Sequence, residues 1–321
     1  MEEQGKDRIA HGNGQMRAQS ISLMCSTRTC CNAGCRFCIS RTTPDADTLA
    51  RSPDNIVLCG ERRLRVGLQY AERLGATHAI LTGKADPTQE DPNYLLWLAA
   101  VAREYVPAVD MHTNGFLLHP GKSRARLLEQ LNDQGLTMVS FSIASFDEKT
   151  NRELMGIPKS AAELIPTARE LELLVRCSLV MNAQGVRDTA GVLDYIRTAG
   201  NLGAHQVVVR EIWRPKVCGP CNAGVYEWSH ANAIDVATIQ EEFIRIASDP
   251  NNAYGLQQRD RLPWGTPVFV VGGHFNDPSH GVNVTFSCTE EGTGGAVLKS
   301  IVHKPDGHGY RNWDHNGESL Y

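Results

Sequence analysis

The stretch Cys31-Asn32-Ala33-Gly34-Cys35-Arg36-Phe37-Cys38 places three cysteines on one short segment, with the spacing C-x3-C-x2-C. It follows an apolar run, 20–24, that predicts a short strand. Three thiolates on one tight loop suit a cuboidal [4Fe-4S] cluster, which takes one thiolate per iron, and they leave the fourth iron open to a small chelating ligand. Gly34 gives the loop backbone angles that other residues resist. The stretch therefore predicts a reactive metal cluster at the end of a strand.

Apolar runs and helical patterns alternate on both sides of this loop up to residue 212. The predicted strands are 20–24, 78–82, 108–112, 138–143, 177–181 and 206–212, and the predicted helices are 55–74, 93–105, 123–134, 161–174 and 188–199. Six alternations with short links imply right-handed crossovers and a parallel sheet. A closed barrel uses eight such units, so the sequence predicts an α/β fold built on a partial (β/α)6 barrel of parallel strands. In such folds the active site forms at the C-terminal ends of the strands.

The predicted organisation has three parts. Residues 1–19 are polar and are expected to be a flexible lead-in, and residues 20–215 form the partial barrel. Residues 216–321 are richer in Gly, Pro, Asn and His, with one helix at 236–247 and short strands at 267–271, 281–287 and 296–303. We expect this smaller, β-rich C-terminal region to cap the barrel mouth and to shape the substrate pocket.

The composition excludes several classes of protein. Hydrophobic residues make up 41% of the 321 residues, which predicts a packed core. A net charge of −4 argues against a protein that coats nucleic acid, which would carry a basic excess. No long apolar run and no N-terminal apolar segment is present, so we expect no membrane span, no secretory signal and a cytoplasmic location. The ten cysteines should then stay reduced, which favours metal ligation over disulfides.

The C-x3-C-x-aromatic-C loop after the first strand resembles that of the radical S-adenosylmethionine (SAM) superfamily, over about residues 20–215. The resemblance implies that Cys31, Cys35 and Cys38 hold a [4Fe-4S] cluster and that SAM binds its open iron. It also implies one-electron cleavage of SAM to methionine and a 5′-deoxyadenosyl radical, which abstracts hydrogen from a substrate. Phe37, just before the last cysteine, is expected to shield the cluster or to contact a bound ligand.

The same resemblance assigns SAM contacts to the strand ends. Residues 82–88 (TGKADPT) stand where relatives carry a Gly-Gly-Glu-Pro-like segment, so Asp86 would accept the SAM ammonium beside Gly83 and Ala85. Asn114 lies in a Thr-Asn-Gly turn that is similar to molybdenum-cofactor cyclase-like members. The other expected contacts are Ser142, Ser145, Asn182 and Arg210. Turns, satisfied strand-edge hydroxyls and a structural Arg–Glu pair on the sixth strand remain the alternative interpretations.

Other cysteines leave a second site open. Cys218, Cys221 and Cys288 are expected to be ordinary thiols, and an auxiliary iron–sulfur cluster or a zinc ion is the alternative. Cys25 and Cys30 lie outside the triad and are expected to be spectators.

The sequence therefore predicts a radical SAM enzyme that acts on a small-molecule substrate, with a nucleotide- or sugar-like metabolite as the first choice. Its electron is expected from an external one-electron reductant such as flavodoxin or ferredoxin, and no nucleic-acid partner is expected. The alternatives are an enzyme that modifies a ribosomal peptide and a non-enzymatic iron–sulfur or zinc-binding module. A degenerate fold that binds SAM without turnover is a further alternative, motivated by Lys84 and Ala144.

Overall fold

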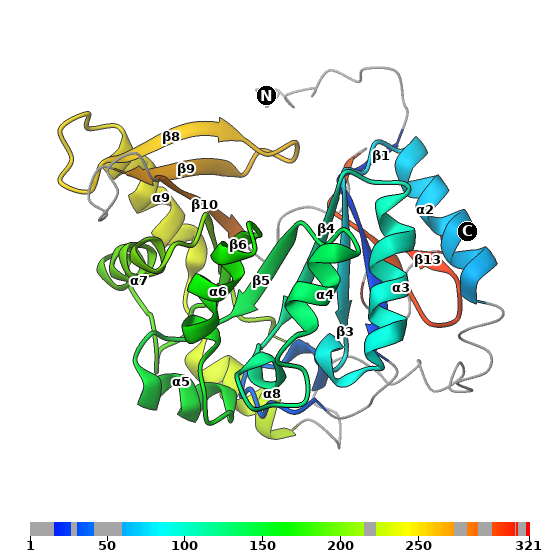
Figure 1. The fold of residues 1–321 in the computed structure, drawn as a ribbon. Helices are drawn as coiled ribbons and strands as arrows, with labels where there is room; N and C mark the ends of the chain where they lie inside the picture. The colour runs from blue at the N-terminus through cyan, green and yellow to red at the C-terminus, as the bar shows by residue number, and fades with distance from the viewer. Residues whose placement is uncertain are drawn as a thin grey trace, which may run out of the picture.

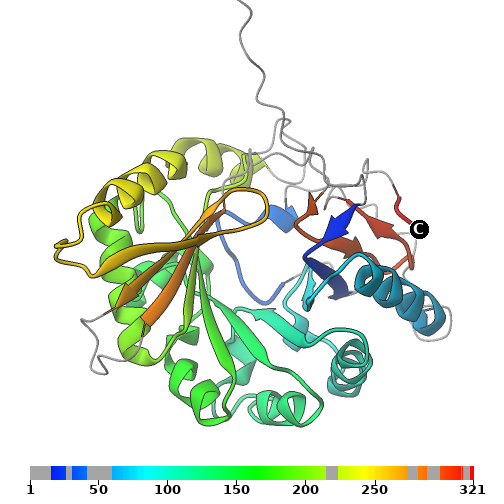
Figure 2. The ribbon, with the colours of Figure 1, turned by 90° about the horizontal axis from the view of Figure 1, so that it is seen from above.

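The computed structural model describes residues 16–26, 31–41, 60–214, 223–272, 281–287, 297–311, 313 and 319–321. Its centre is an eleven-stranded sheet with the order β13-β12-β2-β3-β4-β5-β6-β7-β10-β9-β8, which curves into an open barrel (Figures 1 and 2). Within it, the predicted partial barrel is confirmed by parallel neighbours in chain order: β2 (Ser20–Ser26), β3 (His78–Gly83), β4 (Ala108–Thr113), β5 (Met138–Ser142), β6 (Leu174–Val180) and β7 (Gln206–Arg210).

Helices return the chain along the outside of these strands. They are α2 (Gly60–Arg73), α3 (Pro92–Arg103), α4 (Leu127–Asp133), α6 (Ile165–Glu170) and α7 (Thr189–Leu202). Asp91 and Asp188 start α3 and α7 by accepting backbone N–H groups of the first turn. Because side chains alternate along a strand, Val109 and Phe141 point outward into the apolar core while their neighbours face the barrel interior. No helix in the described part of the chain is long and apolar enough to cross a membrane.

Local signals explain where the helices differ from the predicted ones. The helix expected over 161–174 is divided, because a 3-10 turn, η5 (Ala161–Leu164), leads into α6 with a proline in its first turn, and β6 already begins at Leu174. Two helices were not predicted, α5 (Glu148–Met155) and α8 (Ala223–Asn232). Both are short, and α5 is bounded by an Asp147 cap and by Gly156 rather than marked by a long apolar pattern.

The C-terminal strands extend the barrel sheet at both edges. β10 (Gly281–Ser287) is parallel to β7 and carries the antiparallel strands β9 (Pro267–Gly272) and β8 (Leu256–Arg261). β12 (Ile301–His303) is parallel to β2 and carries β13 (Gly309–Tyr310). The expected strand 296–303 is split, because β11 (Val297–Leu298) pairs instead with β1 (Arg17–Ala18). The boundary at residue 215 and the capping role of 216–321 stay predictions.

One helix of the C-terminal region, α9 (Val236–Ala247), has the predicted bounds. Its Phe243 packs edge-on against Phe269 of β9 and Phe286 of β10, with ring centroids 5.6 and 5.0 Å away. All three rings are buried in the main core, so this aromatic contact fixes the outer strands to the barrel.

Candidate active site at the barrel mouth

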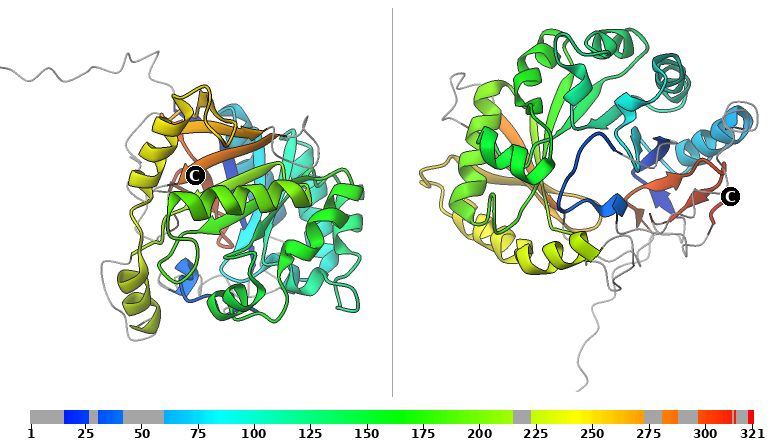
Figure 3. Two further views of the ribbon diagram at one scale, coloured as in Figure 1. Left: turned by 90° about the vertical axis from the view of Figure 1, so that its left-hand side faces the viewer. Right: turned by 90° about the horizontal axis from the view of Figure 1, so that it is seen from below.

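The cysteine loop lies at the end of the barrel where the parallel strands finish, and it ends in a 3-10 turn, η1 (Ile39–Arg41) (Figure 3). Two backbone hydrogen bonds attach it to the end of α5: the Gly34 N–H donates to Met155 O (2.8 Å) and the Arg36 N–H donates to Leu154 O (3.0 Å). Gly34 also lies directly against Gly156, whose φ is +65°, and a Cβ at residue 156 would be 3.0 Å from the Gly34 Cα and N. A helix that sequence reasoning missed therefore positions the loop.

The three cysteines of the loop are free thiols, each partly buried. Burial raises the pKa of the Cys35 thiol to about 12, and the charges of Cys38 and Cys31 add to the rise. Within the described residues, no three His, Cys, Asp or Glu side chains are close enough to hold a single metal ion. A cuboidal cluster takes one thiolate per iron and keeps its ligands further apart than a single ion does. Three free thiols on one loop, near enough for their charges to interact, fit that donor set.

Asp86 connects the ends of β3 and β4. Its carboxylate accepts the Thr113 hydroxyl (2.9 Å), the Asn114 backbone N–H (2.6 Å) and the Thr88 backbone N–H (3.0 Å) in the 3-10 turn η3 (Pro87–Gln89). Burial raises the pKa of the Asp86 carboxyl, and these hydrogen bonds oppose the rise. Both carboxylate oxygens already accept hydrogen bonds, so Asp86 acts here as a connector. Its contact with the SAM ammonium stays a prediction.

Asn114 continues this connection to the cysteine loop. Its Nδ2 donates to Asn32 Oδ1 (2.7 Å) and lies 3.8 Å from Cys31 Sγ. The Asn32 N–H in turn donates to Gln89 Oε1 (2.8 Å). Asp86 and Asn114, both predicted from the family resemblance, thus hold the first cysteine of the triad in place.

The other predicted contacts on the strand ends differ in whether their side chains already make hydrogen bonds. Ser142, the last residue of β5, is half-buried, and its hydroxyl has no hydrogen-bond partner within the described ranges. The Ser145 hydroxyl accepts the Asp147 N–H (3.0 Å) at the start of α5. Asn182 is fully buried, and its side chain closes its own turn by donating to Val180 O (3.0 Å). Among the described residues, Ser142 is therefore the hydroxyl of this group without a hydrogen bond, and the SAM contacts of Ser142, Ser145 and Asn182 stay predictions.

Residues with small side chains precede Asp86 because β2 approaches this segment closely. A Cβ at Gly83 would lie 2.4 Å from the Ser26 Cβ and 2.9 Å from the Ser26 N. Ala85 is buried beside it. The glycine has a packing reason here, and a backbone contact of Gly83 and Ala85 with SAM stays a prediction.

An aromatic contact joins the cysteine loop to the C-terminal region. Phe37 packs against Trp228 of α8, with ring centroids 6.1 Å apart. Both border a small apolar cluster, separate from the main core, made of Ala33, Ala144, Leu154, Met155 and Ile157. The Trp228 indole Nε1 is buried without a hydrogen-bond partner, which costs free energy unless a bound group accepts it. Sequence reasoning missed Trp228, because α8 lacks a long apolar pattern.

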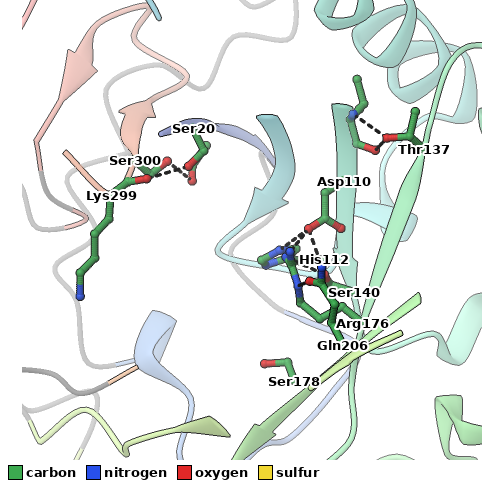
Figure 4. Close-up of polar contacts among 12 residues, drawn as sticks. Ser20, Asp110, His112, Thr137, Ser140, Arg176, Ser178, Gln206, Lys299 and Ser300 are labelled. Atoms are coloured by element: carbon green, nitrogen blue, oxygen red, sulfur yellow. Dashed lines mark hydrogen bonds and ion pairs between the residues drawn. The ribbon is translucent and has the colours of Figure 1, made fainter. Parts of the chain in front are cut away.

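A second polar group lies deeper, inside the barrel (Figure 4). Asp110 Oδ2 accepts from Arg176 Nη1 (2.7 Å) and from the Ser140 hydroxyl (2.9 Å), and His112 Nε2 lies 3.0 Å away. Arg176 Nε also donates to Gln206 Oε1 (3.0 Å). Burial alone would raise the pKa of Asp110, but the charges of His112 and Arg176 and the hydrogen bonds from His112 and Ser140 hold it well below its usual range. Sequence reasoning missed this group. Its signal in the sequence was the pair of charged or titratable residues at alternate positions of one strand, Asp110 and His112.

The remaining cysteines give no second site in the described part of the chain. Cys25 and Cys177 are fully buried on the barrel strands, and the Cys25 thiol donates to Thr82 O (3.1 Å). The predictions about Cys30, Cys218, Cys221 and Cys288 concern residues outside the described ranges.

Comparison with known proteins finds one family and several structures. The model of the radical SAM superfamily matches residues 26–199, more than half of the chain. Similar solved structures include coproporphyrinogen III oxidase (HemN) from Escherichia coli, a radical SAM enzyme, at 11% identity and a TM-score of 0.46, covering 81% of this chain and 67% of that one. Another is methylornithine synthase (PylB), at 16% identity and a TM-score of 0.42, covering 61% and 53%. A comparison with curated proteins finds no match.

Proposed function

The chain belongs to the radical SAM superfamily, a family of enzymes that use SAM and an iron–sulfur cluster, and from this premise we propose the form that the chemistry takes here. Cys31, Cys35 and Cys38 hold a [4Fe-4S] cluster, and SAM is the ligand of its open iron. The observation that supports this most directly is three free thiols on one loop at the barrel mouth, near enough for their charges to interact. The molybdenum-cofactor cyclase-like resemblance of Asn114 is not part of the proposal.

When bound, the cluster and SAM supply a one-electron cleavage that gives methionine and a 5′-deoxyadenosyl radical able to abstract hydrogen. The protein holds the ligand loop in position through the Gly34–Gly156 contact and the Asn114–Asn32 hydrogen bond. Phe37 and Trp228 keep water from the thiols, and the free Ser142 hydroxyl is available to a SAM polar group. An external reductant such as flavodoxin or ferredoxin provides the electron.

The substrate is a small molecule that enters the polar interior of the barrel. Several inward side chains of the strands, including Asp110, His112 and Arg176, are charged or polar, whereas branched apolar residues fill a closed barrel. A polar interior below the cysteine loop suits a polar metabolite.

Anaerobic reconstitution with iron and sulfide tests the proposal. Wild-type protein should become brown, contain iron and sulfide, and release 5′-deoxyadenosine from SAM when dithionite is added. Cys31→Ala should lose most of its iron and all release, whereas Cys177→Ala, which removes a buried thiol on β6, should keep both. Zinc without iron in the wild type, or unchanged release by Cys31→Ala, would contradict the assignment.

A further inference from the structure

Arg210, the last residue of β7, directs its guanidinium into the barrel interior. Its Nε donates to the Ser178 hydroxyl on β6 (2.9 Å), and Ser178 points into the interior below Asp110 and Gln206 (Figure 4). The two Nη groups of Arg210 have no hydrogen bond or ion pair with any residue in the described ranges. Four of the five N–H donors of the guanidinium are therefore unused by the described residues.

The charges around Arg210 do not balance. Arg176 is neutralised by Asp110 at 2.7 Å, and no carboxylate among the described residues pairs with Arg210. Burial lowers the pKa of Arg210 to about 10, the nearby charge of Arg176 adds to the fall and the charge of Asp110 opposes it, so the group stays charged at neutral pH. Arg210 is a half-buried cation without an ion-pair partner among the described residues, and an arginine fork matches carboxylate and phosphate groups. Among the described residues, the Arg210 guanidinium thus has no ion-pair partner.

The position of Arg210 separates this charge from the cysteine loop. In the β6–β7 ladder Arg210 is level with Val180, Ser178 lies level with Val208, and Arg176 lies level with Gln206. By bonding to Ser178, the Arg210 side chain turns back from the strand end toward the Asp110–Arg176 pair. The cysteine loop lies on the other side, at the mouth.

Asp110 adds a second sign that the polar interior is incomplete without a ligand. Its Oδ1 is buried and has no hydrogen-bond partner, while Oδ2 accepts three contacts. Buried acceptors are normally satisfied, so this oxygen lacks a donor that the described residues do not provide.

We propose that Arg210, held by Ser178, binds an anionic group of the substrate, a carboxylate or a phosphate, inside the barrel. This rests on the proposed function in that the ligand is the enzyme's small-molecule substrate. It replaces the expectation that Arg210 contacts SAM. The carboxylate of SAM is a second anionic group with the same chemistry, and the experiment below distinguishes it from a group of the substrate.

Calorimetric titration of the full chain with inorganic phosphate, before cluster reconstitution, tests the anion site directly. Arg210→Gln should weaken phosphate binding at least tenfold, and Arg210→Lys, which keeps the charge but not the fork, should weaken it less. Arg126→Gln is the control, because Arg126 is exposed on the surface beside Glu129, and it should bind phosphate as the wild type does. Equal binding by the wild type and Arg210→Gln would overturn the proposal.

SAM binding by the reconstituted enzyme distinguishes the two sources. Arg210→Gln should bind SAM within twofold of the wild type, and phosphate should not compete with SAM. A tenfold loss of SAM affinity, or competition between phosphate and SAM, would assign Arg210 to the SAM carboxylate and overturn the proposal. If the wild type fails to cleave SAM, the proposed function is wrong, while the phosphate titration still decides the anion site.

Discussion

Asp110 is the residue on which the polar interior of the barrel depends. It is 1% exposed and holds Arg176 by a 2.7 Å ion pair, so removing its charge leaves a guanidinium without its partner. Breaking a buried pair in this way costs about 3–5 kcal/mol. We expect Asp110→Asn to lower the free energy of unfolding by that amount in urea titrations at neutral pH.

Glu129→Gln is the matched control for this substitution, because Glu129 pairs with Arg126 on the exposed side of α4, where solvent screens both charges. We expect no measurable change in its unfolding midpoint. Similar losses in both variants would show that the Asp110 pair contributes no more than a surface contact.

The depressed pKa of Asp110 also gives a pH dependence. The pKa of an unfolded Asp is about 3.9, and the pKa of the folded group is lower. The ion pair therefore contributes fully to the free energy of unfolding above that pH, and its contribution falls as the pH drops below it. Between about pH 4 and pH 2, the wild type should lose stability more steeply than Asp110→Asn. Urea titrations at a series of pH values measure the two slopes, and parallel slopes would contradict the assignment.

The sequence predicted single residues where a local pattern carries the chemistry. The cysteine triad was visible because its members are neighbours in the chain. The Asp110–Arg176 pair was not, since the partners are 66 residues apart and meet only when β4, β5 and β6 lie side by side. Asp86 was singled out as a SAM contact by its position after a strand, and that contact stays a prediction. Its hydrogen bonds to Thr113 and Asn114 depend on the neighbouring strand end and were not predicted.

At the scale of elements, the contact between the cysteine loop and the end of α5 makes a specific prediction. Gly156→Ala would place a Cβ 3.0 Å from the Gly34 backbone and would strain a left-handed φ. Gly75→Ala has the same kind of strain, at φ +86°, but its Cβ would meet no atom within 4 Å. Both should lose about 1–2 kcal/mol of stability, and only Gly156→Ala should lose iron on reconstitution. Iron per chain is the measurement, and equal iron in both variants would contradict the positioning role.

The helix α8 makes a second prediction at this scale. Trp228→Ala removes the ring that packs on Phe37, so we expect the reconstituted protein to lose its visible absorption in air several times faster than the wild type. Tyr226→Ala on the same helix is the control, because Tyr226 pairs with His230 instead. The rate of bleaching under air is the readout, and identical rates for the two variants would show that α8 does not shield the loop.

Elements were predictable where an apolar period persists. The six barrel strands and α9 came close to their observed bounds, whereas α5 and α8 were missed because each depends on caps and tertiary contacts rather than on a long pattern. The predicted helix over 161–174 is too long. Periodicity alone does not show that the helix ends at Glu170 and that Leu174 already pairs with Met138 in the sheet.

At the scale of the whole molecule, the C-terminal strands and the barrel form one hydrogen-bonded sheet. β12 pairs with β2 although Ile301 and its partner Ile21 are 280 residues apart, and β10 pairs with β7. No local signal in the sequence specifies either pairing. Sequence reasoning predicted these strands and could not predict their neighbours. Parallel pairing between distant segments depends on the completed barrel edges.

This continuity predicts that the C-terminal strands unfold together with the barrel. In native-state hydrogen exchange, the amides of β10 should require the same opening free energy as those of β6, because β7 is hydrogen-bonded to both. Independent exchange of β10 at a much lower free energy would instead show that residues 216–321 unfold as a unit of their own.

The outer edge of the sheet has a consequence for how copies of the protein meet one another. On one side, β8 pairs with no strand among the described residues. Five of its six residues are exposed, and its pairing with β9 shifts register between Gln258 and Asp260. Irregular, charged edges resist pairing with strands of another chain. Arg259, Asp260 and Arg261 therefore act as gatekeepers against aggregation, so the colloidal stability of concentrated solutions depends on a strand that lies far from the cysteine loop.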